Sequence, residues 1–314
     1  MEKLELIFDT DAGSDCDDMM ALAYLIYAQK YLNVEIKAVT HCLRAPEGVP
    51  ALRSFFRYFG EALPPMGRMV GGADLEDFYC KSVADSFAAE SDYEDIPTAV
   101  SVLRRALVSC RDKCVICAVG QFTNLAALME SPADEISPLD GISLLHEKCA
   151  KLVVMAGKFQ EDELGVRDAD WNIKWDVPSA KKMFADCPVP IVMLPSETGT
   201  DMITGKREME LYGESTPLTK AFFQFPWAKD GRHSWDPATA VYAVEGKKEF
   251  LKESAPGNLV ITNTGVTYFE PDPRGNITLL SMNCAGKSEQ KAKDAMADYI
   301  DGCALKILSE AAWH

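Results

Sequence analysis

The stretch Leu4-Glu-Leu-Ile-Phe-Asp-Thr-Asp-Ala-Gly-Ser-Asp-Cys-Asp-Asp18 joins a short apolar run to five aspartates within ten residues. Carboxylates this close repel one another, and a folded chain tolerates them only when a positive group lies among them. Hard carboxylate oxygens favour Ca²⁺ or Mg²⁺ over zinc. The stretch therefore predicts a divalent-cation site in preference to a solvated acidic loop.

The residues around the aspartates predict how the cluster is assembled. The apolar run before them is typical of a buried strand, and the apolar segment after them is typical of a mostly buried helix. Asp9 and Asp11 are two residues apart, so their side chains point the same way on an extended chain. Gly13 permits a tight turn. Asp17 and Asp18 fall in the first helical turn, where the helix dipole favours negative charge. We expect the carboxylates to meet at one point.

Strand-like runs alternate with helix-like segments along the first two thirds of the chain. This order predicts an α/β fold with an open, mostly parallel sheet and helices on both faces. Such sheets bind ligands beyond the carboxyl ends of their strands, which is where the aspartates lie. The expected strands are Leu4–Phe8, Val34–Val39, Val115–Val119, Leu152–Ala156 and Pro190–Leu194, and the expected helices are 17–32, 48–60, 96–112, 123–131 and 177–186.

The last third of the chain has a different pattern. A helix is expected over residues 237–253, followed by two β-rich runs at Asn258–Thr264 and Asn276–Met282. The turn Asp272-Pro-Arg-Gly-Asn276 predicts a hairpin or strand pair there. A final helix is expected over residues 288–311.

Composition limits the class of protein. The 314 residues are 47% hydrophobic and contain no linker, low-complexity tract or repeat, so we predict a single domain over residues 1–314. Lys and Arg number 32 against 48 Asp and Glu, and the net charge of −16 argues against nucleic acid or an anionic membrane surface as partner. No segment is apolar enough to span a bilayer and no signal peptide is expected, so we predict a cytoplasmic protein.

The ten cysteines lie mostly inside apolar runs. The pair in Cys114-Val-Ile-Cys117 allows a zinc or redox interpretation, but it sits in a strand-like run, and no second pair or histidine cluster lies close in sequence. We therefore predict buried, reduced thiols.

Four segments, in order, resemble one family. Asp9-Thr-Asp-Ala-Gly-Ser-Asp-Cys-Asp-Asp18 resembles the N-terminal signature of the inosine-uridine-preferring nucleoside hydrolases, in the branch with two extra residues before the final Asp-Asp. Val119-Gly-Gln-Phe-Thr-Asn-Leu125, Asp170-Trp-Asn-Ile-Lys-Trp-Asp176 and Arg232-His-Ser-Trp-Asp-Pro237 resemble three later family segments. The resemblance implies a nucleoside hydrolase-like fold, hydrolysis of ribonucleosides in purine or pyrimidine salvage, and a homodimer or homotetramer.

The resemblance also implies a Ca²⁺ ion at the bottom of a pocket. Its protein ligands would be three carboxylates and one backbone carbonyl, those of Asp11, Asp18, Asp236 and Thr123. Asp9 would pack behind these ligands. Asp15 is grouped with Asp9 as a supporting residue, although it falls in the two-residue insertion and its role is open.

Asp11 is the expected general base. Cleavage of an N-glycosidic bond builds positive charge on the sugar while the base departs with negative charge. Ca²⁺ has room for a vicinal diol and a water and lowers the pKa of that water, so Asp11 can take its proton. The surrounding carboxylates favour the cationic sugar.

The substrate side departs from the family pattern. Asp17, Asp170 and Asn172 resemble residues that bind the ribose hydroxyls, but Asp170 replaces a Glu. Trp235 stands where family members usually carry a His beside the departing base, and we expect it to stack on a base or close the pocket. His41, at the end of a strand, is an alternative leaving-group acid. The base is not defined, and a modified nucleoside whose base leaves without protonation is one hypothesis.

Three alternatives remain open on the sequence. The aromatic residues Phe222, Phe223, Phe225 and Trp227 would either line a base pocket or belong to the core. The chain could be a nucleoside- or ribose-binding homologue with little or no turnover. A Mg²⁺-dependent phosphatase of the haloacid dehalogenase class would use Asp9 as nucleophile and Asp11 as acid, but that class needs Thr or Val where this chain has Gly13.

Overall fold

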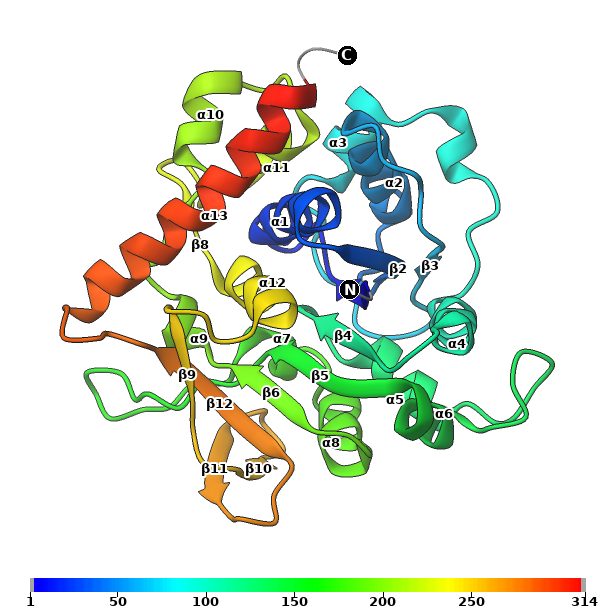
Figure 1. The fold of residues 1–314 in the computed structure, drawn as a ribbon, viewed down its shortest axis with the longest axis vertical. Coiled ribbons are helices and arrows are strands. Elements are labelled where there is room, and N and C mark those ends of the chain that lie inside the picture. Colours follow the sequence, from blue (N-terminus) through cyan, green and yellow to red (C-terminus); the bar gives the residue numbers. More distant parts are fainter. Residues whose placement is uncertain (1–2, 312–314) are drawn as a thin grey trace.

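The computed structural model describes residues 3–311 and centres on a ten-stranded sheet (Figure 1). Its strand order is β11-β10-β12-β6-β5-β4-β1-β2-β3, with β9 paired to β12. Every neighbouring pair from β12 to β3 is parallel, and β9, β10 and β11 pair antiparallel. The strands are β1 (Leu4–Thr10), β2 (Val34–His41), β3 (Met66–Arg68), β4 (Cys114–Ala118), β5 (Cys149–Met155), β6 (Ile191–Leu194), β9 (Leu251–Glu253), β10 (Gly257–Ile261), β11 (Thr267–Pro271) and β12 (Ile277–Met282).

Helices cover both faces of the sheet, so the predicted α/β architecture is confirmed. One apolar core lies between the sheet and the first group of helices, and a second lies between the opposite face and the other group (Figure 1). The first group is α1 (Asp17–Tyr31), α2 (Gly48–Tyr58), α3 (Cys80–Phe87), α11 (Pro217–Gln224), α12 (Trp235–Glu245) and α13 (Glu289–Ala311). The second group is α4 (Ala99–Ser109), α5 (Thr123–Glu130), α6 (Gly141–Lys148) and α8 (Val177–Asp186).

Shorter elements complete the chain. They are the 3₁₀ turn η1 (Glu90–Tyr93), the helices α7 (Trp171–Lys174), α9 (Ser196–Gly199) and α10 (Lys206–Tyr212), and a two-stranded sheet of β7 (Ile203–Thr204) and β8 (Arg232–His233). This small sheet leads directly into α12.

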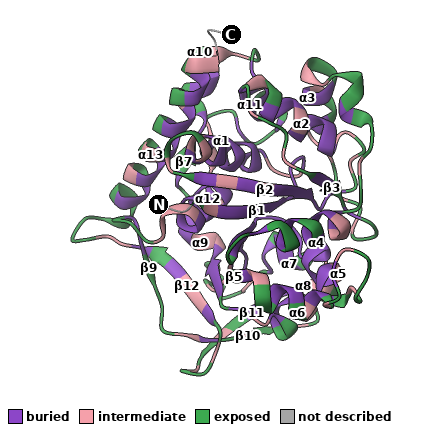
Figure 2. Cartoon of the chain, turned by 45° about the vertical axis from the view of Figure 1, so that its right-hand side comes forward, coloured by how far each residue is buried: buried purple, intermediate pink, exposed green. Residues whose placement is uncertain are grey.

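Helix α1 is buried on almost every side (Figure 2). Its segment from Met19 to Ile26 is apolar all round, as expected for a helix enclosed by other elements. It packs against α12 and α13, while β1 runs between β2 and β4 near the middle of the sheet. The carboxyl end of β1 and the start of α1 are therefore held firmly together.

The C-terminal part differs from the sequence prediction in two places. The turn 272–276 joins β11 to β12, but β10 lies between them, so the hairpin is β10–β11 and its turn is 262–266. Strand β11 was not predicted from the sequence; it is a partly exposed edge strand with Glu270 and Pro271 at its end. The helix expected over 237–253 ends at Glu245 because Gly246 follows with a φ of 69°, a left-handed conformation that favours glycine.

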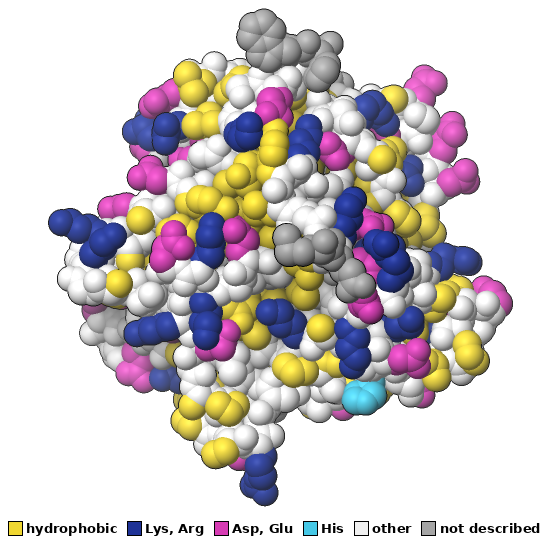
Figure 3. All heavy atoms as spheres, in the orientation of Figure 1, with side chains coloured by type: hydrophobic (Ala, Val, Ile, Leu, Met, Phe, Trp, Pro, Cys, Tyr) yellow, Lys and Arg dark blue, Asp and Glu magenta, His cyan; other side chains and the backbone are white. Residues whose placement is uncertain are grey.

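The cysteine prediction is confirmed: all ten thiols are free, and all except the partly exposed Cys284 are buried. Among residues 3–311, no helix is long and apolar enough to cross a membrane. On the face seen in Figure 3, basic side chains are scattered among acidic ones.

Candidate functional site

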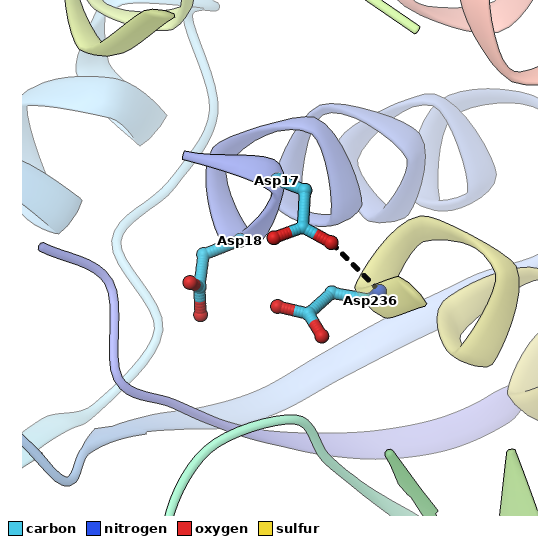
Figure 4. A group of neighbouring side chains, drawn as sticks. All are labelled: Asp17, Asp18 and Asp236. Atoms are coloured by element: carbon cyan, nitrogen blue, oxygen red, sulfur yellow. Dashed lines mark hydrogen bonds between the residues drawn. The ribbon is translucent and has the colours of Figure 1, made fainter. Parts of the chain in front are cut away.

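Three buried carboxylates from two distant parts of the chain converge at the carboxyl edge of the sheet (Figure 4). Asp17 and Asp18 open α1, and Asp236 lies in the first turn of α12. One oxygen from each lies within 4.8 Å of the others, and their exposed fractions are 1–5%. We call Asp17, Asp18 and Asp236 the acidic triad.

Hydrogen bonds hold the triad in place. Oδ2 of Asp17 accepts from the backbone amides of Trp235 and Asp236, both at 3.0 Å, so α1 and α12 meet head to head. Oδ1 of Asp18 accepts from the hydroxyl of Thr10. The second oxygen of Asp18 is buried and has no hydrogen-bond partner in the described chain. A buried carboxylate oxygen without a partner is costly, so this position suits a positively charged ligand.

Asp11 lies beside the triad. Its Oδ2 accepts from Ser14 Oγ and from Gln121 Nε2, the latter at 2.7 Å, while no side chain among residues 3–311 donates to Oδ1. Gly120 permits this close approach, because a Cβ there would lie 2.8 Å from the Cβ of Asp11.

Asp9, expected to support the metal ligands from behind, is fully buried. It accepts from the Thr40 hydroxyl and from Asn124 Nδ2, the latter at 2.8 Å. Its second oxygen has no partner in the described chain.

Burial raises the pKa of every one of these carboxyls. Desolvation, moderated by hydrogen bonds, raises the pKa of Asp9 to about 7 and that of Asp11 to about 6. The pKa of each triad member is raised further, first by burial and then by the neighbouring carboxylates. A hard divalent cation would remove this repulsion, and its preferred ligands are carboxylate oxygens such as these. The residues present therefore fit such an ion.

The triad overlaps the predicted ligand set without matching it. Asp18 and Asp236 belong to both sets, whereas the third member of the triad is Asp17, which was expected to bind the sugar, and not Asp11. Asp11 is still near enough for its charge to raise the pKa of Asp18 and of Asp236. Thr123 is the first residue of α5, its hydroxyl donates to Asp176, and it does not line the pocket described next. Its role as a carbonyl ligand stays a prediction.

A pocket of about 760 Å³ opens above these carboxylates. Asp11 and the triad line its floor, and Asp170 and Asn172 line a side wall. Asp170 caps α7 through the Asn172 amide at 3.1 Å and accepts from Ser196 Oγ at 2.8 Å. Asn172 Nδ2 donates to the carbonyl of Val119 at 2.7 Å. The wall is therefore rigid before any ligand enters.

Trp235 lines the pocket next to Asp236. Its indole N–H donates to the Ser196 carbonyl at 2.7 Å and to Thr200 Oγ1 at 3.2 Å. Gly199 makes room for the ring, because a Cβ there would lie 2.5 Å from it. The indole is thus fixed as a wall of the pocket.

Arg232 is a site residue that was not predicted from the sequence. Its Nε donates to Asp15 Oδ1 at 2.8 Å and its Nη2 also donates to this carboxylate. The guanidinium lies over the rings of Phe225 and Trp235, 5.1 and 4.8 Å from their centroids. Asp15 thus lines the pocket as the partner of Arg232, and not behind the metal ligands as expected. No local spacing signals this pairing.

Histidine is absent from the pocket lining in the described part of the chain. His41, the expected alternative acid, is fully buried, and its Nε2 lies 2.7 Å from the Ala12 carbonyl. Burial lowers its pKa, and Gly48 packs directly on the ring. This position does not support a role as leaving-group acid. His233 is also away from the lining and accepts from the Asp201 amide at 2.8 Å.

The four aromatic residues before α12 were expected either to line a base pocket or to belong to the core, and the structure places some of them in each. Phe225 and Trp227 line the pocket together with Phe78, and the three rings pack edge to face with centroids 5.3–5.5 Å apart. Phe222 belongs to the core, whereas Phe223 is exposed.

The family model described as "Inosine-uridine preferring nucleoside hydrolase" matches residues 6–291. The pyrimidine-specific ribonucleoside hydrolase RihA of Klebsiella pneumoniae (strain 342) is 24% identical over 269 residues, which cover 77% of this chain and 80% of that protein.

Two solved structures show the same fold. An inosine-uridine preferring nucleoside hydrolase from Bacillus anthracis matches with a TM-score of 0.68 at 18% identity, over 96% of this chain and 99% of that chain. A purine-preferring ribonucleoside hydrolase from Gardnerella vaginalis matches with a TM-score of 0.70 at 17% identity, over the same shares of the two chains.

Proposed function

The chain belongs to the inosine-uridine preferring nucleoside hydrolase family, and from this premise we propose that it hydrolyses the N-glycosidic bond of a ribonucleoside with Ca²⁺ at the acidic triad and Asp11 as general base. The products are ribose and the free base. The observation that carries the proposal is the group of buried carboxylates on the floor of a pocket, with one oxygen of Asp18 left unpartnered.

Asp18 and Asp236 would hold the ion, with Asp17 and Asp11 on either side. A bound Ca²⁺ supplies room for sugar hydroxyls and lowers the pKa of a water. Asp11, to whose Oδ1 no described side chain donates, would take the proton of the attacking water. The remaining negative charge of the floor favours the cationic sugar that forms as the base departs.

Asp17, Asp170 and Asn172 would orient the ribose. All three line the pocket, and hydrogen bonds to the backbone fix each one in advance. Pre-oriented groups lower the entropic part of the barrier because they do not need to reorganise around the sugar.

The identity of the released base is less well supported than the binding of ribose. One relative is named as pyrimidine-specific and one structural neighbour as purine-preferring, so family likeness does not select a base. Since no histidine lines the described pocket, we propose a nucleoside whose base departs without protonation by histidine, which includes modified nucleosides. Salvage of bases and a homodimer or homotetramer follow from the family as further expectations.

The test is a panel of nucleosides and p-nitrophenyl riboside, assayed with Ca²⁺ and after chelation. The riboside has a good leaving group, so its cleavage reports the sugar and metal chemistry alone. We expect calcium-dependent cleavage of the riboside and of some nucleosides. A wild-type enzyme that cleaves none of them at high concentration would contradict the proposal.

A nucleoside- or ribose-binding protein without turnover is the second candidate, and the absence of a histidine from the described pocket favours it. It predicts calorimetric binding of ribose or nucleosides with no product. The haloacid dehalogenase alternative finds no support, because Asp9, its required nucleophile, is fully buried and does not line the pocket.

A further inference from the structure

We propose that Arg232 stabilises the departing base, and that the pocket selects aromatic leaving groups that leave as anions with a hydrogen-bond acceptor facing this guanidinium. The proposal rests on the proposed function above. It assigns to one residue of this chain the task of accommodating negative charge on the leaving group.

The guanidinium is fixed from three sides. The rings of Phe225 and Trp235 lie against it, and Asp15 engages its Nε and Nη2. Its side chain is 17% exposed and lines the pocket. The hydrogen bonds of the guanidinium within residues 3–311 run from Nε and Nη2 to Asp15 and none runs from Nη1, which leaves one N–H edge for a ligand. A planar, permanently charged donor held between rings suits an aromatic anion.

Both supports of Arg232 are adjacent to the metal site in sequence. Asp15 lies two residues before Asp17, and Trp235 directly precedes Asp236. The indole of Trp235 packs against the guanidinium, and the backbone amide of Trp235 donates to Asp17 at 3.0 Å. The guanidinium therefore stands beside the sugar site and not at a remote part of the pocket.

The balance of charge in the pocket explains why a leaving anion needs such a donor. Eight of the lining residues are acidic, whereas Lys158 and Arg232 are its two basic ones. An anionic base would be repelled by the floor that favours the cationic sugar. Asp15 offsets the net charge of Arg232. Arg232 therefore contributes mainly a hydrogen bond in a fixed direction, and little long-range positive potential.

The step balances without transfer of the guanidinium proton. The bond from C1′ to the base nitrogen breaks, and its electron pair passes to the base. The water oxygen bonds to C1′, and the water proton passes to Asp11. Arg232 donates a hydrogen bond to the anionic base and remains protonated. The released base takes a proton from solvent, Asp11 returns its proton to solvent, and the net reaction is nucleoside plus water to ribose plus neutral base.

The experiment compares kcat/KM across ribosides of graded leaving-group acidity, from p-nitrophenyl riboside to the poorest nucleoside that the wild-type enzyme cleaves. In Arg232→Gln, kcat/KM should fall little for the riboside. It should fall roughly 10²–10³-fold for the substrate with the poorest leaving group, which is the range for removal of one stabilising donor. The kcat/KM of Arg232→Lys should lie between those of the wild-type enzyme and Arg232→Gln, because lysine keeps the positive charge but lacks the planar pair of N–H donors.

Lys158→Gln is the matched control for loss of one cation from the same pocket, and it should leave the dependence on leaving-group acidity unchanged. Equal losses on all substrates in Arg232→Gln would assign Arg232 a merely structural role and overturn the proposal. The proposal would also be overturned if kcat/KM depended on leaving-group acidity as steeply in Lys158→Gln as in Arg232→Gln. Circular dichroism and calcium affinity check that each variant is folded.

A binding measurement separates this proposal from the proposed function. With ribose and Ca²⁺ present, the wild-type protein should bind p-nitrophenolate more tightly than p-nitroaniline, and Arg232→Gln should abolish the difference. If the wild-type protein prefers p-nitrophenolate but cleaves no substrate, the proposed function is wrong and the assignment of Arg232 still holds. Unchanged preference in Arg232→Gln would overturn the assignment of Arg232, whether or not the enzyme turns over.

Discussion

Asp17 fixes Asp236: its Oδ2 accepts a 3.0 Å hydrogen bond from the backbone amide of a residue 219 positions later in the chain. The same oxygen accepts from the Trp235 amide, so one carboxylate satisfies two of the free N–H groups at the start of α12. The side chain of Asp236 is thereby held facing Asp18 (Figure 4). The proposed metal site therefore depends on how α1 and α12 pack, and three of the four predictions concern this site.

The first prediction concerns the residues that hold the cation. Asp18→Asn and Asp236→Asn should each weaken calcium binding at least tenfold, a change of about 1.4 kcal/mol, because each removes a charged ligand atom from the triad. Isothermal titration calorimetry of the chelator-treated protein measures this. Asp74→Asn, at another acidic residue of the same pocket, is the control. Unchanged affinity in both triad variants would contradict the assignment.

The second prediction separates Asp11 from the triad. Asp11→Asn should lower kcat for p-nitrophenyl riboside by roughly 10²–10⁴-fold, the usual effect of losing a general base. Calcium affinity should fall less than in Asp18→Asn, since Asp11 lies beside the triad. Steady-state kinetics at saturating Ca²⁺ together with calorimetry provide both values. Riboside cleavage at the wild-type rate would show that another group takes the proton.

The third prediction is that Ca²⁺ stabilises the fold. A ligand that binds only the native state adds about 2.7 kcal/mol at a concentration of 100 times Kd. Chelation should therefore lower Tm, and added Ca²⁺ should restore it. In Asp18→Asn the calcium-dependent part of the shift should shrink or vanish. Differential scanning calorimetry tests this. A Tm that changes neither on chelation nor on addition of Ca²⁺ would argue against a cation in the native site.

The fourth prediction concerns a buried acid pair away from the pocket. Glu208 of α10 is 1% exposed, neither of its oxygens has a hydrogen-bond partner in the described chain, and Asp301 of α13 lies close by. Burial, followed by the charge of Asp301, raises the pKa of Glu208 from 4.5 to about 8. Burial likewise raises the pKa of Asp301 from 3.8 to about 6.

The sign of the resulting pH dependence follows from these shifts. The folded protein keeps protons that the unfolded chain has already lost, so the stabilisation is complete below about pH 4 and disappears as the pH rises through about 8. Tm should therefore fall between pH 5 and 9. Glu208→Gln should flatten this fall, whereas Glu210→Gln, at an exposed residue of the same helix, should not. Parallel Tm profiles for all three proteins would rule out the pair as the cause.

Local pattern was enough to predict most of the sheet and its helices. Apolar runs with turn residues between them placed β1, β2, α1 and α5 within a few residues of their observed bounds, because strand and helix periodicity depend on neighbours in sequence. The edge strand β11 was not predicted because three of its five residues are exposed to solvent and its apolar pattern is weak.

The gathering of aspartates at the end of β1, and with it the expectation of a cation, could be read from the sequence alone, because Asp9 to Asp18 are joined by a short chain that cannot spread apart. Tertiary packing decided the rest. It brought Asp236 to Asp17, paired Asp15 with Arg232 across 217 positions, and turned His41 into the protein interior. These contacts depend on the direction in which separate helices and strands pack, and no local sequence pattern specifies that direction.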